Sequence, residues 1–331
     1  MKTSTKILMM TAMAVISILS TSCDKNTEAA GKDETVSASL TVSVNGCGFT
    51  RSSASETDEV HVGNVQIFVF RNNGELDAYA SSSEKSGIKI SCTTGEKIIT
   101  AIVNAPDLSS ITSHSELMST KSRLTDNSIG NFIMLGEVTT AIGADETVEI
   151  SVSRIVSRVS VEKISAAFTS EAYKKKEFKV TRIYVTNVAG DINYGLDGVS
   201  ESWLNKRGYT QSPADALLYD DIEDTAVTED KPYDGHTCFY VYPNTLNEDP
   251  NDDDNDARMT RLVVETTLGG ITYYYPVRIP GIGSNKTYTI RNMTVTRPGS
   301  ADPDTPVSSD ECSFSITVKD WEEGTSQDLT I

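Results

Sequence analysis

The sequence is poor in the residues from which most enzyme sites are built. Its 331 residues include only three histidines, five cysteines and two tryptophans. His61, His114 and His236 are isolated, so a histidine-built metal or nucleophile site would need distant partners. The sequence contains no Gly-x-Ser-x-Gly, His-Glu-x-x-His, Cys-x-x-Cys or phosphate-loop motif. We therefore expect no enzyme activity, no cofactor and no metal.

Basic residues are also scarce, with 29 Lys and Arg against 47 Asp and Glu, a formal net charge of −18. Nucleic-acid binding depends largely on Lys and Arg that displace counterions, so nucleic acid is excluded as a partner. The acidic run Asn251–Asp256 resembles the start of an EF-hand loop. Ala257 and Val263 stand where that loop needs Gly and a bidentate Glu, so the run predicts a solvated acidic loop.

A long hydrophobic run occurs only at the N-terminus, over residues 7–19. It is short for a bilayer span and ends in small residues, which is typical of a signal peptide. The segment Ser20-Thr21-Ser22-Cys23 resembles the lipobox of bacterial lipoproteins, although Ser20 stands where leucine is usual. We predict that residues 1–22 are the signal and that Cys23 carries lipid; the alternative is ordinary cleavage beside an incidental cysteine.

From Val36 the sequence alternates between apolar and polar residues, the period of a half-buried strand. The apolar positions of this first strand are Val36, Ala38, Leu40, Val42 and Val44. Similar runs and turn signals recur along the chain, which predicts an all-β protein of two sandwich-like domains with a boundary near residue 158. We expect one helix between Leu108 and Leu124, with Asp107 as its cap, a shorter helix between Ala166 and Phe178, and acidic loops at 218–233 and 246–258.

The last strand alternates like the first. Its apolar positions are Cys312, Phe314, Ile316 and Val318, and Trp321 follows them. It comes after a Pro- and Asp-rich connector, residues 297–306, which we expect to be extended and exposed. Just past the first strand, Arg51 is the only Lys or Arg between Lys32 and Arg71. An arginine-specific protease would therefore have one candidate site in that stretch, between Arg51 and Ser52.

The order of these features resembles the fimbrillin family, the subunits of bacterial type V pili. The likeness rests on the signal, the first strand and the Trp321 ending, and on these internal segments: 64–70 leading into Gly74, 102–105, 154–161, 239–244 and 285–290. It implies two β-sandwich domains of transthyretin-like type. Residues 23–51 would be a lipidated tether and removable strand, 52–157 the N-terminal domain, and 158–331 the C-terminal domain ending in a donor strand, 312–321.

The resemblance also implies a mechanism. A palmitate-bearing lipoprotein precursor reaches the cell outer membrane, and an arginine-specific protease cuts after Arg51. The first strand then leaves, and the terminal strand of another copy or a homologous subunit fills its groove. Repetition would build a fimbrium on the cell surface that supports adhesion. This exchange is an instance of β-strand addition.

Other interpretations remain open. The first strand could be a permanent edge of its own sandwich, and the chain an anchor or tip subunit that does not polymerise. It could also be a carbohydrate-binding lipoprotein that uses Trp203, Tyr273 and Tyr275, since aromatic rings stack on sugars, or a hydrolase with an Asp/Glu pair. The four cysteines left after export, Cys47, Cys92, Cys238 and Cys312, allow three full pairings or free thiols.

Overall fold

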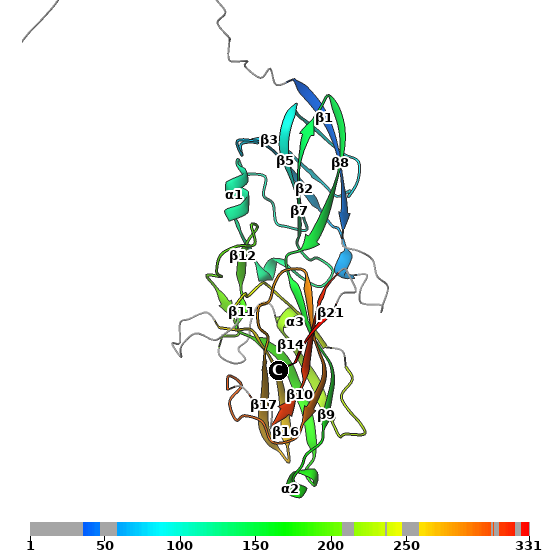
Figure 1. The fold of residues 1–331 in the computed structure, drawn as a ribbon, viewed down its shortest axis with the longest axis vertical. Coiled ribbons are helices and arrows are strands. Elements are labelled where there is room, and N and C mark those ends of the chain that lie inside the picture. The colour runs from blue at the N-terminus through cyan, green and yellow to red at the C-terminus, as the bar shows by residue number, and fades with distance from the viewer. Residues whose placement is uncertain are drawn as a thin grey trace, which may run out of the picture. The chain divides into compact units, whose positions relative to one another are not determined.

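The computed structural model describes residues 36–46, 58–206, 215–235, 237–246, 258–305, 307, 311–321 and 326–330. Within these ranges the chain is nearly all β, which confirms the predicted fold class (Figure 1). The helical elements are short: η1 (Asp58–Val60), α1 (His114–Ser119), η2 (Leu124–Asp126), α2 (Glu171–Lys174) and α3 (Asp215–Leu218).

A seven-stranded sheet contains the first strand. In spatial order its strands are β3 (Leu76–Ser82), β2 (Val65–Arg71), β5 (Gly95–Val103), β7 (Met134–Ile142), β8 (Asp145–Arg154), β1 (Ser37–Gly46) and β4 (Ile88–Thr93). Buried side chains of β1, β4 and β8 belong to the same hydrophobic cluster as those of β2 and β5. The two ends of this sheet therefore enclose one core.

Two further sheets pack around a second hydrophobic cluster. The six-stranded sheet comprises β15 (Thr237–Val241), β9 (Ser157–Ala166), β18 (Lys286–Val295), β20 (Ser315–Asp320) and β21 (Ser326–Thr330), with β19 (Cys312–Ser313) also on β18. The four-stranded sheet comprises β14 (Tyr219–Ala226), β10 (Phe178–Thr186), β16 (Arg261–Leu268) and β17 (Ile271–Arg278). Buried residues of β9, β18, β10 and β16 meet in this cluster, as in a β-sandwich.

Two small ribbons pair segments that are distant in sequence. They are β6 (Lys121–Arg123) with β12 (Asp191–Asn193), and β11 (Val188–Ala189) with β13 (Trp203–Leu204). The Tyr242 hydroxyl lies 2.7 Å from Ser122 Oγ and accepts a hydrogen bond from Asn127 at 2.8 Å. Strand β8 ends in the seven-stranded sheet, and β9 begins three residues later in the six-stranded one. The division of the chain into domains at residue 158 stays a prediction.

The helix predicted within 108–124 is much shorter than expected. Asp107 accepts a hydrogen bond from the Ser109 amide at 3.0 Å, which forms a local turn rather than a helix cap. Ser113 caps the helix instead, and the helix spans only His114–Ser119. The helix predicted within 166–178 shortens in the same way, since β9 continues to Ala166 and only α2 follows.

The acidic segment expected to be a loop at 218–233 contains a strand, β14. It lies at an edge of the four-stranded sheet, where acidic side chains can stay in water. Arg182 of β10 pairs with Asp221 at 2.7 Å across this edge. The second acidic segment, 247–257, lies outside the described residues.

Candidate functional site

Strand β1 is an inner strand of its sheet. It pairs antiparallel with β4 from Ser37↔Thr93 to Val42↔Ile88, and parallel with β8 from Ser39↔Asp145 to Gly46↔Val152. Figure 1 shows it in blue beside β8. Both of its hydrogen-bonding edges are therefore occupied within its own sheet, so β1 is not the edge strand that one interpretation supposed.

The inward face of β1 is closed off from solvent. Ala38 is 4% exposed, Leu40 and Val42 are 0% exposed, and Val44 is 3% exposed. Val36 is 60% exposed, so its predicted place on the buried face is wrong. It precedes the strand, where its backbone pairs with Thr94. The buried face of the first strand thus comprises four residues.

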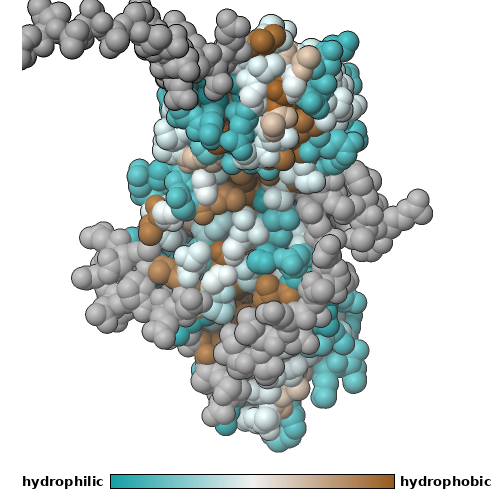
Figure 2. Space-filling model, turned by 45° about the horizontal axis from the view of Figure 1, so that its top comes forward, coloured by the Kyte–Doolittle hydropathy of each residue, from teal (hydrophilic) through white to brown (hydrophobic). Residues whose placement is uncertain are grey.

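These four side chains contact a core supplied by other strands. Its buried members include Val65, Ile67 and Val69 of β2, and Ile99, Ala101 and Val103 of β5. Burial of Leu40, Val42 and Val44 contributes about 1.5–3 kcal/mol each. On the face drawn in Figure 2 the described hydrophobic residues form several separate areas among hydrophilic ones. Loss of β1 would add a continuous apolar groove with two unpaired strand edges.

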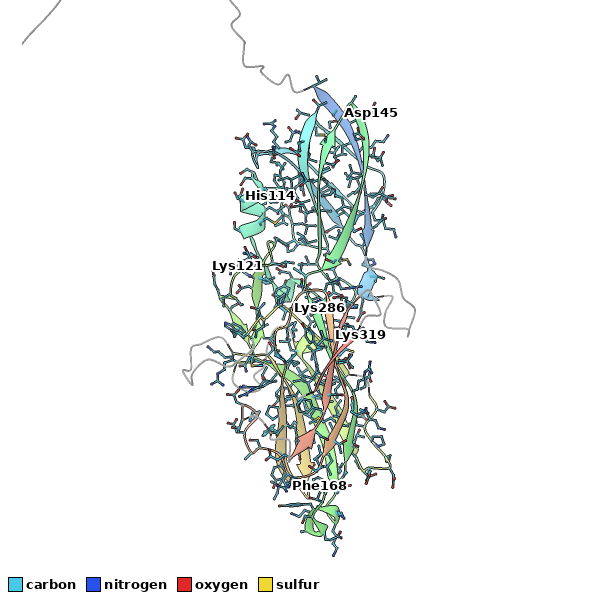
Figure 3. All side chains as sticks on the ribbon, viewed as in Figure 1. His114, Lys121, Asp145, Phe168, Lys286 and Lys319 are labelled. Carbon is cyan, nitrogen blue, oxygen red and sulfur yellow. The ribbon has the colours of Figure 1, made fainter. Side chains whose placement is uncertain are left out.

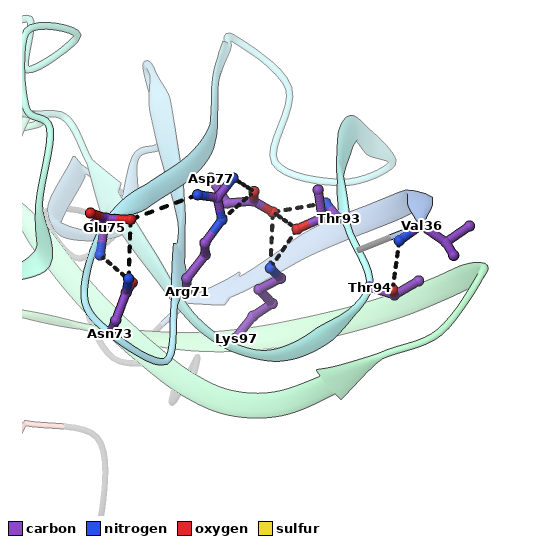
Figure 4. Close-up of polar contacts among 8 residues, drawn as sticks. All are labelled: Val36, Arg71, Asn73, Glu75, Asp77, Thr93, Thr94 and Lys97. Carbon is purple, nitrogen blue, oxygen red and sulfur yellow. Dashed lines mark hydrogen bonds and ion pairs between the residues drawn. The ribbon is translucent and has the colours of Figure 1, made fainter. Parts of the chain in front are cut away.

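A buried ion pair holds β4 in place at one end of this groove (Figure 4). Lys97 of β5 lies 3.0 Å from Asp77 of β3, and their side chains are 3% and 1% exposed. The Asp77 carboxylate also accepts hydrogen bonds from the Thr93 amide at 2.7 Å and the Thr93 hydroxyl at 2.8 Å. Because Thr93 is the last residue of β4, these bonds hold that end of the strand without β1, which is the one strand that β4 pairs with among the described residues.

The environment of Asp77 favours its charged form. Burial acts to raise the pKa of this carboxyl, but hydrogen bonds from Thr93, together with Lys97 and Arg71, outweigh burial and lower the pKa to about 2. Arg71 lies 2.8 Å from the other carboxylate oxygen. The four groups form one network that joins β2, β3, β4 and β5.

The predicted processing sites fall outside the described residues. Strand β1 ends at Gly46, and the next described element is η1 at Asp58. Arg51 and Ser52 lie in the intervening segment, and Cys23 lies before the first described residue. A cut between Arg51 and Ser52 would leave β1 with no covalent link to the other strands of the sheet.

The predicted donor residues lie in their own sheet. Strand β20 pairs antiparallel with β18 on one side and with β21 on the other, and β19 also pairs with β18. Cys312 and Ile316 are buried at 2% and 1% exposure, while Phe314 and Val318 are half-buried against the same cluster. To act as a donor, this strand would have to leave β18.

Trp321, directly after β20, binds a buried carboxylate. Its indole Nε1 donates to Glu59 Oε2 at 3.2 Å, and its ring stacks on Tyr240 with centroids 5.9 Å apart. The Tyr240 hydroxyl donates to Glu59 Oε1 at 2.6 Å. Glu59 is 4% exposed and belongs to η1, the first described element after the predicted cleavage site.

Two arginines complete this cluster. Arg154 donates from Nε to the Glu59 carbonyl at 2.9 Å, and its Cζ lies 4.3 Å from the centroid of the Trp321 ring. Arg158 Nη1 lies 3.2 Å from the Glu59 carboxylate. The Glu59 cluster, defined as Glu59, Arg154, Arg158, Tyr240 and Trp321, thus joins the segment after β1 to the end of β20.

The connector before β19 is partly exposed, as predicted for residues 297–306, but it is anchored to the body of the chain rather than free. Ser300 exchanges backbone hydrogen bonds with Tyr274 at 2.8 and 2.9 Å. Asp304 forms ion pairs with Arg258, at 2.5 Å, and with Arg261. Both arginine side chains are buried, so the chain is fixed as far as Asp304 and any free movement would begin after it.

Cys92 and Cys312 are buried free thiols. Burial raises the pKa of Cys92, and it raises the pKa of Cys312 to about 12 with a smaller effect from Glu311. Cys238 is half-buried, and burial likewise raises its pKa. Cys47 lies outside the described residues.

The aromatic residues proposed for sugar stacking do not form a common surface. Tyr275 is fully buried and donates from its hydroxyl to the Arg297 carbonyl at 2.8 Å. Trp203 lines a hollow with Lys121, Asp191 and Leu196, where Asp191 already pairs with Lys121 at 2.9 Å. Among the described residues, no group of three or more His, Cys, Asp or Glu is arranged to hold a metal, and no helix could cross a membrane.

Sequence reasoning identified β1 and β20 but missed Glu59 and the Asp77–Lys97 pair. One signal for the pair was available, because Lys97 opens the apolar run Ile98–Val103 and falls on its buried side. Nothing near Glu59 in the sequence marks it, since its partners come from residues 154–158, 240 and 321.

Comparison with known proteins agrees with this fold. Residues 21–167 match the family model of the major fimbrial subunit protein (FimA), and no curated protein matches the sequence. The structure is similar to a fimbrilin (FimA) from Porphyromonas gingivalis W83, with a TM-score of 0.65 and 16% identity over 86% of this chain and 98% of that one.

Two further solved structures share the fold. A candidate cell adhesion protein from Parabacteroides distasonis ATCC 8503 has a TM-score of 0.64 and 17% identity, over 88% of this chain and 98% of that one. The tip fimbrial protein Mfa3 from P. gingivalis has a TM-score of 0.52 and 14% identity, over 86% of this chain and 100% of that one. The resemblance to the fimbrillin family is confirmed.

Replacing Asp77 by Asn should destabilise the groove wall, because Lys97 would remain buried without a carboxylate. We expect the free energy of unfolding in urea to fall by about 3–5 kcal/mol. The matched control is Asp145→Asn, at an exposed position on β8 (Figure 3). It should change stability by no more than about 0.5 kcal/mol.

The same pair predicts a pH dependence. The pKa of Asp77 is about 2 in the folded chain, below its ordinary value of 3.8, so the stability that this carboxylate contributes is complete above pH 4 and is lost as the pH falls towards 2. The lost contribution is about 2 kcal/mol. Urea denaturation between pH 5 and 2 should show a shallower acid slope for Asp77→Asn, and equal slopes would contradict this assignment.

Replacing Glu59 by Gln should loosen the end of β20, because the carboxylate accepts from Arg158, Tyr240 and Trp321 together. We expect a loss of about 1.5–3 kcal/mol in unfolding free energy and faster amide hydrogen exchange in β20. Glu84→Gln, at an exposed position, serves as the control. Unchanged exchange in β20 would show that the cluster does not hold this strand.

Proposed function

We propose that this chain is the precursor of a polymerising subunit of a cell-surface fimbria. It is exported as a lipoprotein through Cys23, cut after Arg51 and assembled by exchange of β1 for the C-terminal strand of another copy or a homologous subunit. The position of β1 carries the proposal, because an inner strand with a buried face leaves a strand-shaped vacancy when it departs.

The energetics favour refilling the groove. Burial of the three large inward side chains of a replacement strand contributes about 4.5–9 kcal/mol, before the cost of ordering is subtracted. The edges of β4 and β8 would also regain backbone partners, which buried peptide groups require. The Asp77 network supports this by holding the end of β4 to β3 and β5.

The contact is head-to-tail, since each copy offers a groove in one sheet and a strand from another. Such a contact does not close on itself, so repetition gives a filament. The acidic character of the chain suits a polymer exposed to solvent, where repulsion between charges discourages lateral clumping. The fimbria would support adhesion, with the cell outer membrane holding the lipidated precursor before cleavage.

The alternative is a subunit that keeps its first strand and ends or anchors the filament. The fold alone does not separate these roles, because a tip protein such as Mfa3 shares it. The single arginine between β1 and η1 favours a subunit that is cut there. The carbohydrate-binding interpretation loses support because Tyr275 is a core residue.

Trimming at Arg51 should convert a monomer into filaments. Limited digestion of the chain with an arginine-specific protease, followed by gel filtration and electron microscopy, measures this directly. Arg51→Lys keeps the charge but resists the protease, so it should stay monomeric. Deleting residues 312–331 should also prevent assembly of the trimmed chain.

A trimmed chain that stays monomeric at high concentration would contradict the polymer proposal and favour the anchor role. Filaments from the deletion variant would show that the donor lies elsewhere. The digestion must be checked by mass spectrometry, since the chain carries other arginines that are exposed, such as Arg123.

Replacing Cys23 by Ser should abolish lipid attachment. We expect the wild-type precursor to enter the detergent-rich phase and to incorporate a labelled palmitate analogue in a lipoprotein-producing bacterium. The variant should stay in the aqueous phase and remain unlabelled. A variant that still takes up the label would place the lipid at another residue.

A further inference from the structure

The apolar stretch of the donor strand is bounded by charge on both sides. The four apolar residues at alternate positions from Cys312 to Val318 are followed, at the same spacing, by Asp320 and preceded by Asp310. The four inward sites of β1, from Ala38 to Val44, are each at most 4% exposed. A carboxylate placed in such a site without a partner is strongly unfavourable.

This pattern leaves few registers. Sliding the donor by two residues puts Asp320 at the Val44 site or Asp310 at the Ala38 site, and sliding by one turns the apolar face outward. In the direction of β1, only the register with Cys312 at Ala38 and Val318 at Val44 fills all four sites with apolar side chains. The nine residues of Cys312–Asp320 then match Ala38–Gly46.

Side-chain volume selects the direction. Ala38 is the smallest residue of the buried face of β1, and Cys312 is the smallest of the four donor residues. The reversed strand would place Val318 at the Ala38 site and Cys312 at the Val44 site, overfilling one site and underfilling the other. Both errors destabilise a packed core.

A polar contact agrees with the same register. Asn45 donates from Nδ2 to Glu149 Oε2 of β8 at 3.1 Å. In this register Lys319, labelled on the C-terminal strand in Figure 3, takes the place of Asn45. Its ammonium group would meet the Glu149 carboxylate, so an ion pair replaces the hydrogen bond.

The residue opposite the first inward site is a cysteine. Ala38 and Cys92 are directly paired on antiparallel β1 and β4, and both are buried in the same cluster, so they share a face. Directly opposite residues of antiparallel strands have Cα atoms about 4.5–5.5 Å apart. This lies within the range of about 4.4–6.8 Å that a disulfide spans.

We infer that the exchanged strand docks in this register and that a disulfide then joins Cys312 of one copy to Cys92 of the next. The inference rests on the proposed strand exchange. The oxidant is a small disulfide compound or a disulfide-exchange protein of the oxidising compartment. One cysteine thiolate attacks the oxidant's disulfide and displaces a thiolate. The second cysteine then attacks the mixed disulfide, so two protein thiols lose two electrons and two protons and the oxidant becomes two thiols.

Both thiols are protected until exchange has occurred. Cys312 is 2% exposed in its own sheet, where it pairs with Val295, and Cys92 is 6% exposed beside β1. Buried neutral thiols react slowly, because the thiolate is the nucleophile. Exchange moves Cys312 from its place opposite Val295 to a place opposite Cys92, so the covalent bond forms only between assembled subunits and makes each junction resistant to denaturants.

The test uses full-length protein trimmed at Arg51, assembled in reducing buffer and then treated with oxidised glutathione. Gel filtration in reducing buffer reports assembly, and a non-reducing denaturing gel with peptide mass spectrometry reports the link. We expect a ladder of multimers with a Cys92–Cys312 peptide. Cys92→Ser and Cys312→Ser should assemble in reducing buffer but give no ladder, while Cys238→Ser keeps the ladder.

A matched variant tests the opposite direction. Val44 pairs with Ile150 of β8, so Cys92→Ser/Ile150→Cys would be linked only if Cys312 occupied the Val44 site. A ladder from this double variant, or wild-type filaments without the Cys92–Cys312 link, overturns the register and leaves strand exchange intact. Failure of the trimmed wild type to assemble in reducing buffer overturns the proposed function, and the inference with it.

Discussion

A strand that is hydrogen-bonded along both edges and buried on one face must be replaced if it is removed. Strand β1 meets both conditions, because its two edges pair with β4 and β8 and because Leu40 and Val42 are buried in the core behind it. The Asp77–Lys97 pair and the hydrogen bonds from Thr93 to Asp77 hold the end of β4, which opposes collapse of the vacancy. The rest of the proposed function depends on this constraint.

The proposed donor strand is held in a place of its own, so the proposed assembly would be an exchange between two sites. In the chain described here β20 lies between β18 and β21, and the Glu59 cluster holds its end through Trp321. The free energy of polymerisation would then be the difference between the free energies of holding the strand in the groove and in its own sheet. It would be smaller than the full free energy of filling the groove. Asp304 fixes the connector that precedes the strand, so it would limit how far a released strand could reach.

The Glu59 cluster links the segment after the predicted cleavage site to the proposed donor strand. Glu59 follows the predicted cleavage site by eight residues and binds Trp321, the residue directly after β20. The segment after the cut and the strand that must leave therefore meet in one buried cluster. Removing one partner from a buried ionic cluster strongly destabilises the partners that remain. Partly released positions of the strand are therefore unfavourable, and the strand is expected to be either fully seated or fully released.

Alternation in the sequence was sufficient to predict β1, β20 and the all-β class, because a period of two directly reports a half-buried strand. It could not predict that β1 is internal, since its partners lie near residues 88–93 and 145–152 and pairing over such distances leaves no local signal. The acidic residues of 218–233 led to the prediction of a loop, because the sequence of an acidic edge strand such as β14 resembles that of a solvated loop. Val36 continued the alternation but precedes β1 and is 60% exposed.

The most direct measurement of the central claim is a cryo-electron-microscopy structure of filaments grown from the trimmed chain. The account predicts a strand between β4 and β8 that is continuous with a neighbouring subunit's connector, while each subunit's own Cys312–Asp320 segment is absent from β18. Filaments in which β20 still pairs with its own β18 and the subunits contact through other surfaces would contradict it.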